Sequence, residues 1–176
     1  MNKEHDATLS GLKTAIRMEI DGKEFYLKIS EESSNEAGKK LLKQLSSEED
    51  IHRKVFERIY KEISANEGWP ESKIDPDGIK RLKTVFSEAM NAMKRNPAAF
   101  TTELTSVQKA MDMENKTYDF YISRSARAVH NAEKKLYQEI AAQEKEHHRV
   151  LLDYYEFIKD PASWFVQKEH SSVDGG

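Results

Sequence analysis

Cysteine is absent from this sequence of 176 residues, and glycine and proline occur only 7 and 4 times. The lack of cysteine excludes disulfides, thiolate zinc sites, cysteine-ligated iron–sulfur clusters and thiol catalysis. Because glycine and proline end helices, their scarcity is typical of a protein with long helices. No apolar run is long enough to span a membrane, and the opening residues MNKEHDATLS lack the apolar segment of a signal peptide. We therefore expect a cytoplasmic protein without a membrane partner.

The charged residues, 34% of the chain, are nearly balanced in sign. Lysine and arginine total 28 and aspartate and glutamate total 31, which gives a formal net charge of −3 at pH 7. The basic residues are spread along the chain and form no patch interleaved with aromatics, so the sequence predicts no nucleic-acid partner. Hydrophobic residues make up 38%, enough for a core beneath the solvated faces of amphipathic helices.

Apolar residues recur at three- and four-residue spacing along four long stretches, which predicts four long helices. These stretches cover about residues 8–33, about residues 36–65, a segment beginning near residues 101–104, and the residues from about 131 to just before Asp160. Short turns join the first stretch to the second and the third to the fourth. An insert of roughly 35 residues separates the second from the third, and it contains a turn signal, DPDG, followed by the pattern of one short helix.

Two helical hairpins joined by a long crossover define the expected architecture. We predict an all-α, ferritin-like four-helix bundle over residues 1–160, with a short helix in the crossover. Residues 161–176 show little regular pattern and are expected to form a C-terminal tail.

The sequence repeats itself at an offset of 95 residues. The aligned segments are AIRMEIDGKEFY (15–26) with AMDMENKTYDFY (110–121), and KKLLKQLSSEEDIHRKV (39–55) with KKLYQEIAAQEKEHHRV (134–150). Because one offset aligns both helices of both hairpins, we interpret the pattern as an internal duplication, with repeats over about residues 8–65 and 103–160.

The two repeats share polar residues at positions that lie on the apolar faces of the predicted helices. These residues are Glu19 and Glu114 in the first helix of each repeat, and Glu49, His52, Glu144 and His147 in the second. Within each Glu-x-x-His motif, the spacing of three places the glutamate and the histidine at neighbouring points of one face. The repeats therefore predict four carboxylates and two imidazoles at the bundle axis.

Four carboxylates cannot be buried together without compensation, because removing each isolated charge from water costs on the order of several kcal/mol of desolvation free energy. Protonation or pairing in a metal-free bundle is one solution. Two divalent cations are a better one, since their charges balance four carboxylates and two neutral histidines complete the coordination. Oxygen-rich ligation with some imidazole favours iron or manganese. Di-iron and di-manganese bundles have this pattern: one glutamate from each of two helices and a Glu-x-x-His motif from each of the other two. We therefore predict that these six residues are metal ligands.

Two tyrosines follow the single glutamates on the same helix faces. Tyr26 and Tyr121 lie two turns after Glu19 and Glu114, which is about 10 Å along the helix axis. At that position they are candidate hydrogen-bond partners of the ligands or redox-active phenols.

At these residues the sequence resembles the rubrerythrin family of the ferritin-like superfamily. The resemblance rests on the AIxxExxGxxFY opening, the two Glu-x-x-His motifs and the WF…E…DGG ending, and it extends over essentially the whole chain. It implies an oxidoreductase with two iron ions in a non-haem centre that reduces hydrogen peroxide or oxygen, and a homodimer. The candidate catalytic residues are then the four glutamates, acting through the metals, together with Tyr26 and Tyr121. The resemblance also assigns the ligand roles: bridging for Glu49 and Glu144, terminal for Glu19, Glu114, His52 and His147.

The sequence departs from the family pattern in two respects. Familiar members carry a rubredoxin module whose four cysteines hold an iron, so a chain without cysteine requires an external electron-donor protein. They also carry a further glutamate three residues after the third-helix ligand, where this sequence has Thr117, aligned with Gly22. The predicted site is therefore more symmetric, with one histidine per metal. The same ligands would serve a non-catalytic iron-binding protein for storage, delivery or sensing, so this alternative stays open.

Overall fold

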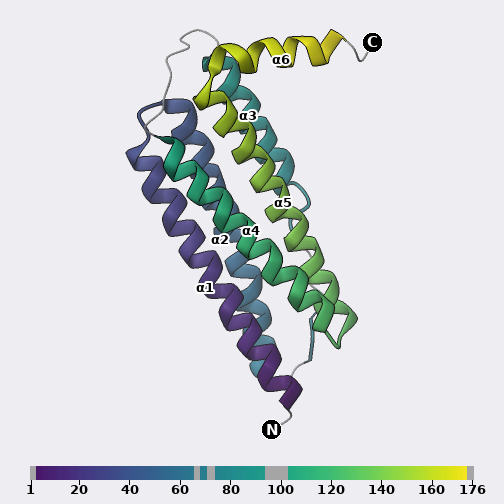
Figure 1. Ribbon diagram of the computed structural model, residues 1–176. Helices are drawn as coiled ribbons and strands as arrows, with labels where there is room; N and C mark the ends of the chain where they lie inside the picture. The colour runs from purple at the N-terminus through teal and green to yellow at the C-terminus, as the bar shows by residue number, and fades with distance from the viewer. Residues whose placement is uncertain (1–2, 66–67, 71–73, 94–102, 174–176) are drawn as a thin grey trace.

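The computed structural model describes residues 3–65, 68–70, 74–93 and 103–173. The helices are α1 (Lys3–Glu32), α2 (Glu36–Ser64), α3 (Gly78–Met93), α4 (Leu104–Arg127), α5 (Asn131–Lys159) and α6 (Pro161–Val173), and no strand occurs in the described part of the chain. The four long helices α1, α2, α4 and α5 form the bundle, and α3 in the crossover packs against α2 and α5 (Figure 1). The prediction of an all-α, ferritin-like bundle of two hairpins is confirmed.

Short polar turns connect the two helices of each hairpin. Between α1 and α2, the side chain of Asn35 accepts a hydrogen bond from the backbone N–H of Gly38 and so caps α2. Such a cap contributes about 1 kcal/mol to helix stability. Gly38 also allows α5 to come close, because a Cβ at this position would overlap the hydroxyl of Tyr154.

Glu103, at the start of α4, ties the two hairpins together at one end of the bundle. Its carboxylate accepts hydrogen bonds from Ser33 Oγ at 2.8 Å, the Ser34 backbone N–H at 3.0 Å and the Tyr154 hydroxyl at 2.7 Å. Ser33 and Ser34 belong to the α1–α2 turn, whereas Tyr154 lies on α5. A buried polar network therefore joins the α1–α2 turn to α4 and α5 at this end of the bundle.

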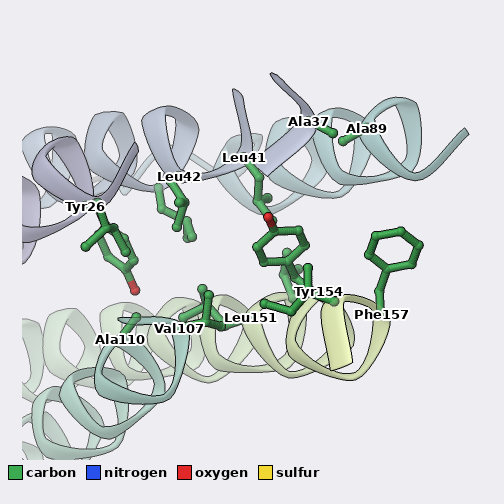
Figure 2. Packing of buried hydrophobic residues seen from close by; sticks show 14 of the residues in the cluster. Tyr26, Ala37, Leu41, Leu42, Ala89, Val107, Ala110, Leu151, Tyr154 and Phe157 are labelled. Atoms are coloured by element: carbon green, nitrogen blue, oxygen red, sulfur yellow. The ribbon is translucent and has the colours of Figure 1, made fainter. Parts of the chain in front are cut away.

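Two apolar clusters fill the bundle. The first includes Leu41, Leu42, Val107, Leu151 and Phe157, and the second includes Leu12, Phe56, Ile59, Leu136 and Ile140. Figure 2 shows the first cluster, in which leucines of α2 face side chains of α4 and α5. Along each long helix, the repeated glutamates and histidines fall between the members of the two clusters. The polar residues therefore form a layer across the middle of the bundle, closed by apolar side chains on both sides.

Helix α6 follows α5 directly, where we expected a tail with little regular structure. Pro161 starts the helix with a backbone already suited to it, and the preceding Asp160 accepts hydrogen bonds from the N–H and the hydroxyl of Ser163 at 3.1 and 2.6 Å. Trp164 and Phe165 pack edge-on against Phe157 of α5, with ring centroids 5.6 and 5.8 Å away. Proline capping and aromatic packing thus order this segment, which lies across one end of the bundle (Figure 1).

Among the described residues, none of the helices combines the length and the apolar character needed to cross a membrane.

Candidate metal centre

The six glutamates and histidines that recur between the repeats meet in one buried layer. Each of the four long helices contributes to it: Glu19 from α1, Glu49 and His52 from α2, Glu114 from α4, and Glu144 and His147 from α5. None of the six is more than 3% exposed. The duplication places them together because equivalent faces of the two hairpins both turn toward the bundle axis.

The layer contains two groups of four residues whose donor atoms lie within 4.8 Å of one another. The groups are Glu19, Glu49, His52 and Glu144, and Glu49, Glu114, Glu144 and His147. Two residues, Glu49 and Glu144, belong to both groups. A carboxylate has two oxygens and can serve two cations at once, so the arrangement offers two adjacent positions for cations that share two carboxylates.

Both histidines direct the same ring atom, Nδ1, at the carboxylates. Nδ1 of His52 lies 3.0 Å from Glu144 Oε1 and 3.5 Å from Glu19 Oε2. Nδ1 of His147 lies 3.1 Å from Glu49 Oε1. The two rings stack, with centroids 5.6 Å apart and an interplanar angle of 10°. The layer therefore presents two nitrogen donors and four carboxylates to a common space.

Several donor atoms in this layer have no well-aligned hydrogen bond to any described residue. They are Glu19 Oε2, His52 Nδ1, Glu114 Oε2 and Glu144 Oε1. A buried polar atom without a partner costs about 1–3 kcal/mol, and these four carry lone pairs that a cation would use. Oxygen and imidazole donors are those that iron and manganese accept. The residues present therefore fit a pair of divalent cations.

Without a cation, protons balance the charge of the layer. Burial and the neighbouring carboxylates raise the pKa of Glu49 well above its usual range and that of Glu114 to about 8. Burial alone would lower the pKa of His52 and His147, but the glutamates around them outweigh it and hold both pKa values well above the usual range. Burial would also raise the pKa of Glu144, yet its close neighbours Glu114, His147 and His52 keep that pKa well below its usual value. Cations must displace these protons, so their binding depends on pH.

Tyr26 and Tyr121 each donate a hydrogen bond to the single glutamate of the opposite repeat. Tyr26 of α1 bonds Oε1 of Glu114 on α4, and Tyr121 of α4 bonds Oε1 of Glu19 on α1. Figure 2 shows the Tyr26 hydroxyl pointing from α1 toward α4. Burial and the nearby carboxylates raise the pKa of both phenols well above 10, so both keep their protons. Each tyrosine thus holds one oxygen of a glutamate, and the other oxygen, Oε2, has no well-aligned hydrogen bond to any described residue.

Thr117, at the position where familiar rubrerythrins carry a further glutamate, turns its hydroxyl to its own helix. Its Oγ1 donates to the backbone carbonyl of Met113 at 3.0 Å. The equivalent Gly22 has no side chain, and a Cβ there would lie 3.5 Å from Glu49 Cγ, an ordinary contact. Neither position adds a carboxylate to the layer.

Sequence reasoning missed Gln143, which contacts the layer from outside. Its Oε1 lies 2.8 Å from Nε2 of His52, and the residue is 7% exposed. Gln143 directly precedes Glu144, and the residue at the same place in the first repeat is Glu48. A polar residue immediately before each Glu-x-x-His motif was the only signal in the sequence that could have pointed to it.

A four-helix bundle with four glutamates and two histidines across its middle defines the class of ferritin-like, carboxylate-rich metal-binding proteins. The family model of the rubrerythrins matches residues 11–155. The chain belongs to the rubrerythrin family, a family of di-iron proteins, and the matched region contains the complete polar layer. Comparisons with curated proteins and with solved structures gave no match.

Proposed function

We propose that the protein is a non-haem di-iron oxidoreductase, which reduces hydrogen peroxide or oxygen with electrons from an external donor protein. The observation that carries this proposal is the pair of four-residue groups that share Glu49 and Glu144. Two adjacent cation positions with common carboxylates suit chemistry that needs two electrons at one place.

The ligand roles follow from membership of the two groups. Glu49 and Glu144 would be shared by the two cations, because each belongs to both groups. Glu19 and His52 complete one position, and Glu114 and His147 complete the other. Iron is the metal that the family implies, and manganese or another divalent metal suits the same donors.

When bound, a pair of ferrous ions supplies the two electrons that cleavage of one O–O bond requires. The chain's own residues hold the site and control its protons. The apolar clusters on both sides of the layer exclude water, which strengthens every charge interaction inside it. Tyr26 and Tyr121 orient Glu114 and Glu19 through hydrogen bonds and keep a proton next to each carboxylate.

The electrons come from a separate protein in this proposal, because the chain has no cysteine to bind an iron–sulfur or rubredoxin-type centre. A homodimer and a cytoplasmic location remain predictions made from the sequence. Light scattering coupled to size-exclusion chromatography tests the first of them.

Metal content per folded chain is the experiment that tests the proposal. The protein is loaded anaerobically with Fe(II), desalted and analysed for iron, and peroxide consumption is then followed in a stopped-flow spectrometer. We expect about two irons per chain, turnover of peroxide, and loss of both in Glu49→Ala and Glu144→Ala. Glu139→Ala is the control, since Glu139 is a partly exposed glutamate of α5 paired with Lys135 outside the layer.

The other outcomes contradict the proposal in distinct ways. Two irons without turnover of peroxide or oxygen would make the protein a non-catalytic iron binder, and many irons per chain would indicate storage. A folded wild-type protein without iron would show that protons alone neutralise the layer.

A further inference from the structure

We propose that Gln143 is a positioning residue, which fixes His52 in the tautomer whose Nδ1 binds metal and which is itself oriented by the crossover between the two hairpins. This inference rests on the metal site proposed above. It concerns Gln143, which is not one of the six ligands, and residues 74–78 of the crossover, which contribute no residue to the metal layer.

The amide of Gln143 joins the metal layer to the crossover. On one side, its Oε1 lies 2.8 Å from Nε2 of His52. On the other side, its Nε2 donates to the backbone carbonyl of Asp75 at 3.4 Å. His52 and Gln143 are both buried, so solvent does not compete strongly for either group.

The direction of these two hydrogen bonds determines the tautomer. A backbone carbonyl can only accept, so Asp75 requires the NH₂ end of the amide, and the oxygen end then faces His52. The oxygen of Gln143 can only accept as well, so Nε2 of His52 carries a proton. A neutral imidazole protonated at Nε2 has its lone pair at Nδ1, and Nδ1 is the atom that faces Glu144 and Glu19.

A charged network holds the crossover carbonyl in place. Arg81 of α3 bonds the side chain of Asp75 at 2.8 Å and the buried carboxylate of Glu48 on α2 at 3.2 Å. Gly78, at the start of α3, lets the crossover approach this closely. A Cβ at Gly78 would lie 2.6 Å from Glu48 Oε2 and 3.5 Å from Gln143 Oε1. The start of α3 therefore lies directly over the two residues that precede the Glu-x-x-His motifs.

The duplication is broken at this point. Glu48 occupies in the first repeat the place of Gln143 in the second, but its carboxylate accepts hydrogen bonds from Gln44 at 2.6 Å and from Arg81. The amide of Gln143 contacts His52, whereas the carboxylate of Glu48 anchors α3 through Arg81. The chain has a single crossover, and it contacts the two repeats through different groups: Arg81 bonds Glu48 of the first repeat, and the carbonyl of Asp75 accepts from Gln143 of the second. We therefore expect the two metal positions to differ, with Gln143 supporting the one that contains His52.

The test compares metal binding in wild-type protein, Gln143→Leu and the control Gln138→Leu. Gln138 is an exposed residue of α5, so its variant carries the same substitution on the same helix away from the layer. Anaerobic Co(II) titration, followed by calorimetry and by the visible bands of bound Co(II), measures the affinity of each position. Loss of a hydrogen-bond partner behind a ligand typically lowers affinity about 10–100-fold. We expect that loss at one of the two positions in Gln143→Leu and no change in Gln138→Leu.

A second readout reports on His52 alone. Long-range ¹H–¹⁵N spectra of the Zn(II)-loaded protein should show a slowly exchanging Nε2–H on His52, which Gln143→Leu should shift and expose to rapid exchange. Unchanged affinity at both positions, with an unchanged His52 signal, would overturn the inference. If Gln143→Leu does not fold, Gln143→Asn withdraws the amide from His52 by one methylene and is judged by the same criteria. Wild-type protein that binds no Co(II) or Zn(II) would instead overturn the metal site itself.

Discussion

Replacing Tyr121 by phenylalanine tests how the metal layer is held together. The substitution removes one hydroxyl from a side chain that is 0% exposed and leaves its ring in place. That hydroxyl donates to Oε1 of Glu19, another residue with 0% exposure, so water cannot replace the lost donor. Loss of this donor leaves a buried carboxyl oxygen without a hydrogen bond, which costs about 1–3 kcal/mol. We expect Tyr121→Phe to lower the free energy of unfolding of the metal-free protein by that amount.

Tyr137 provides a matched control next to the same residue. Its ring stacks on that of Tyr121 with centroids 5.8 Å apart, and it too is 0% exposed. Its hydroxyl is buried next to Arg124, but it has no well-aligned hydrogen bond to any described residue. Removing a buried hydroxyl that lacks a partner is nearly neutral or stabilising. Tyr137→Phe should therefore leave the free energy of unfolding unchanged or raise it slightly.

Urea unfolding of the metal-free protein at pH 7, followed by circular dichroism, measures both variants. In thermal unfolding of the same proteins, a loss of about 1–3 kcal/mol should lower the melting temperature by about 2–12 °C for a chain of this size. Tyr26→Phe should behave like Tyr121→Phe, since Tyr26 donates in the same way to Glu114. Equal stability of Tyr121→Phe and Tyr137→Phe would refute the reasoning, because it would show that the tyrosine–glutamate bonds do not stabilise the layer.

Two further predictions concern stability. The metal-free protein should lose stability as pH rises from about 4.5 to about 8. In this range the folded state still holds protons on Glu49 and on Glu114, whose pKa is about 8, whereas the unfolded chain has released them. Denaturation midpoints at pH 5, 6.5 and 8 measure how stability depends on pH, and Glu114→Gln should make this dependence weaker. A midpoint that rises with pH would contradict the prediction. Gly38→Ala should cost about 1–3 kcal/mol because its methyl group would overlap the Tyr154 hydroxyl. Gly22→Ala, whose Cβ has room, should instead stabilise α1 by about 0.5–1 kcal/mol, and equal effects of the two variants would refute the packing argument.

The fold could be predicted from the sequence because its signals are local. Three- and four-residue spacing of apolar positions marks each long helix, and the lengths of the turns distinguish the hairpins from the crossover. Errors arose at the ends, where that pattern is weak. Helix α1 begins at Lys3 instead of about residue 8, and α6 occupies residues that were expected to lack regular structure. The order in α6 comes from the Asp160 cap, from Pro161 and from contacts of Trp164 and Phe165 with Phe157, all of them local signals that sequence reasoning overlooked.

The sequence by itself determined which residues enter the polar layer. A glutamate or histidine on an apolar helix face must be buried when the helix packs, and the 95-residue offset repeats this arrangement in the second hairpin. For the same reason, the positions of Tyr26 and Tyr121 near the layer could be anticipated from two turns of helix. These conclusions depend only on helical geometry within one segment.

Only the tertiary structure decided which of these groups touch. Tyr26 bonds Glu114 across the bundle and not Glu19 on its own helix, and His52 meets Gln143 of the other hairpin. Such pairs are 88 and 91 residues apart in the chain. Their contacts depend on the rotation and the relative height of two packed helices, which a shift of one residue would change. The sequence repeat is nearly symmetric, but a single crossover must pass on one side of the bundle, and this is why Gln143 and Glu48 have different partners.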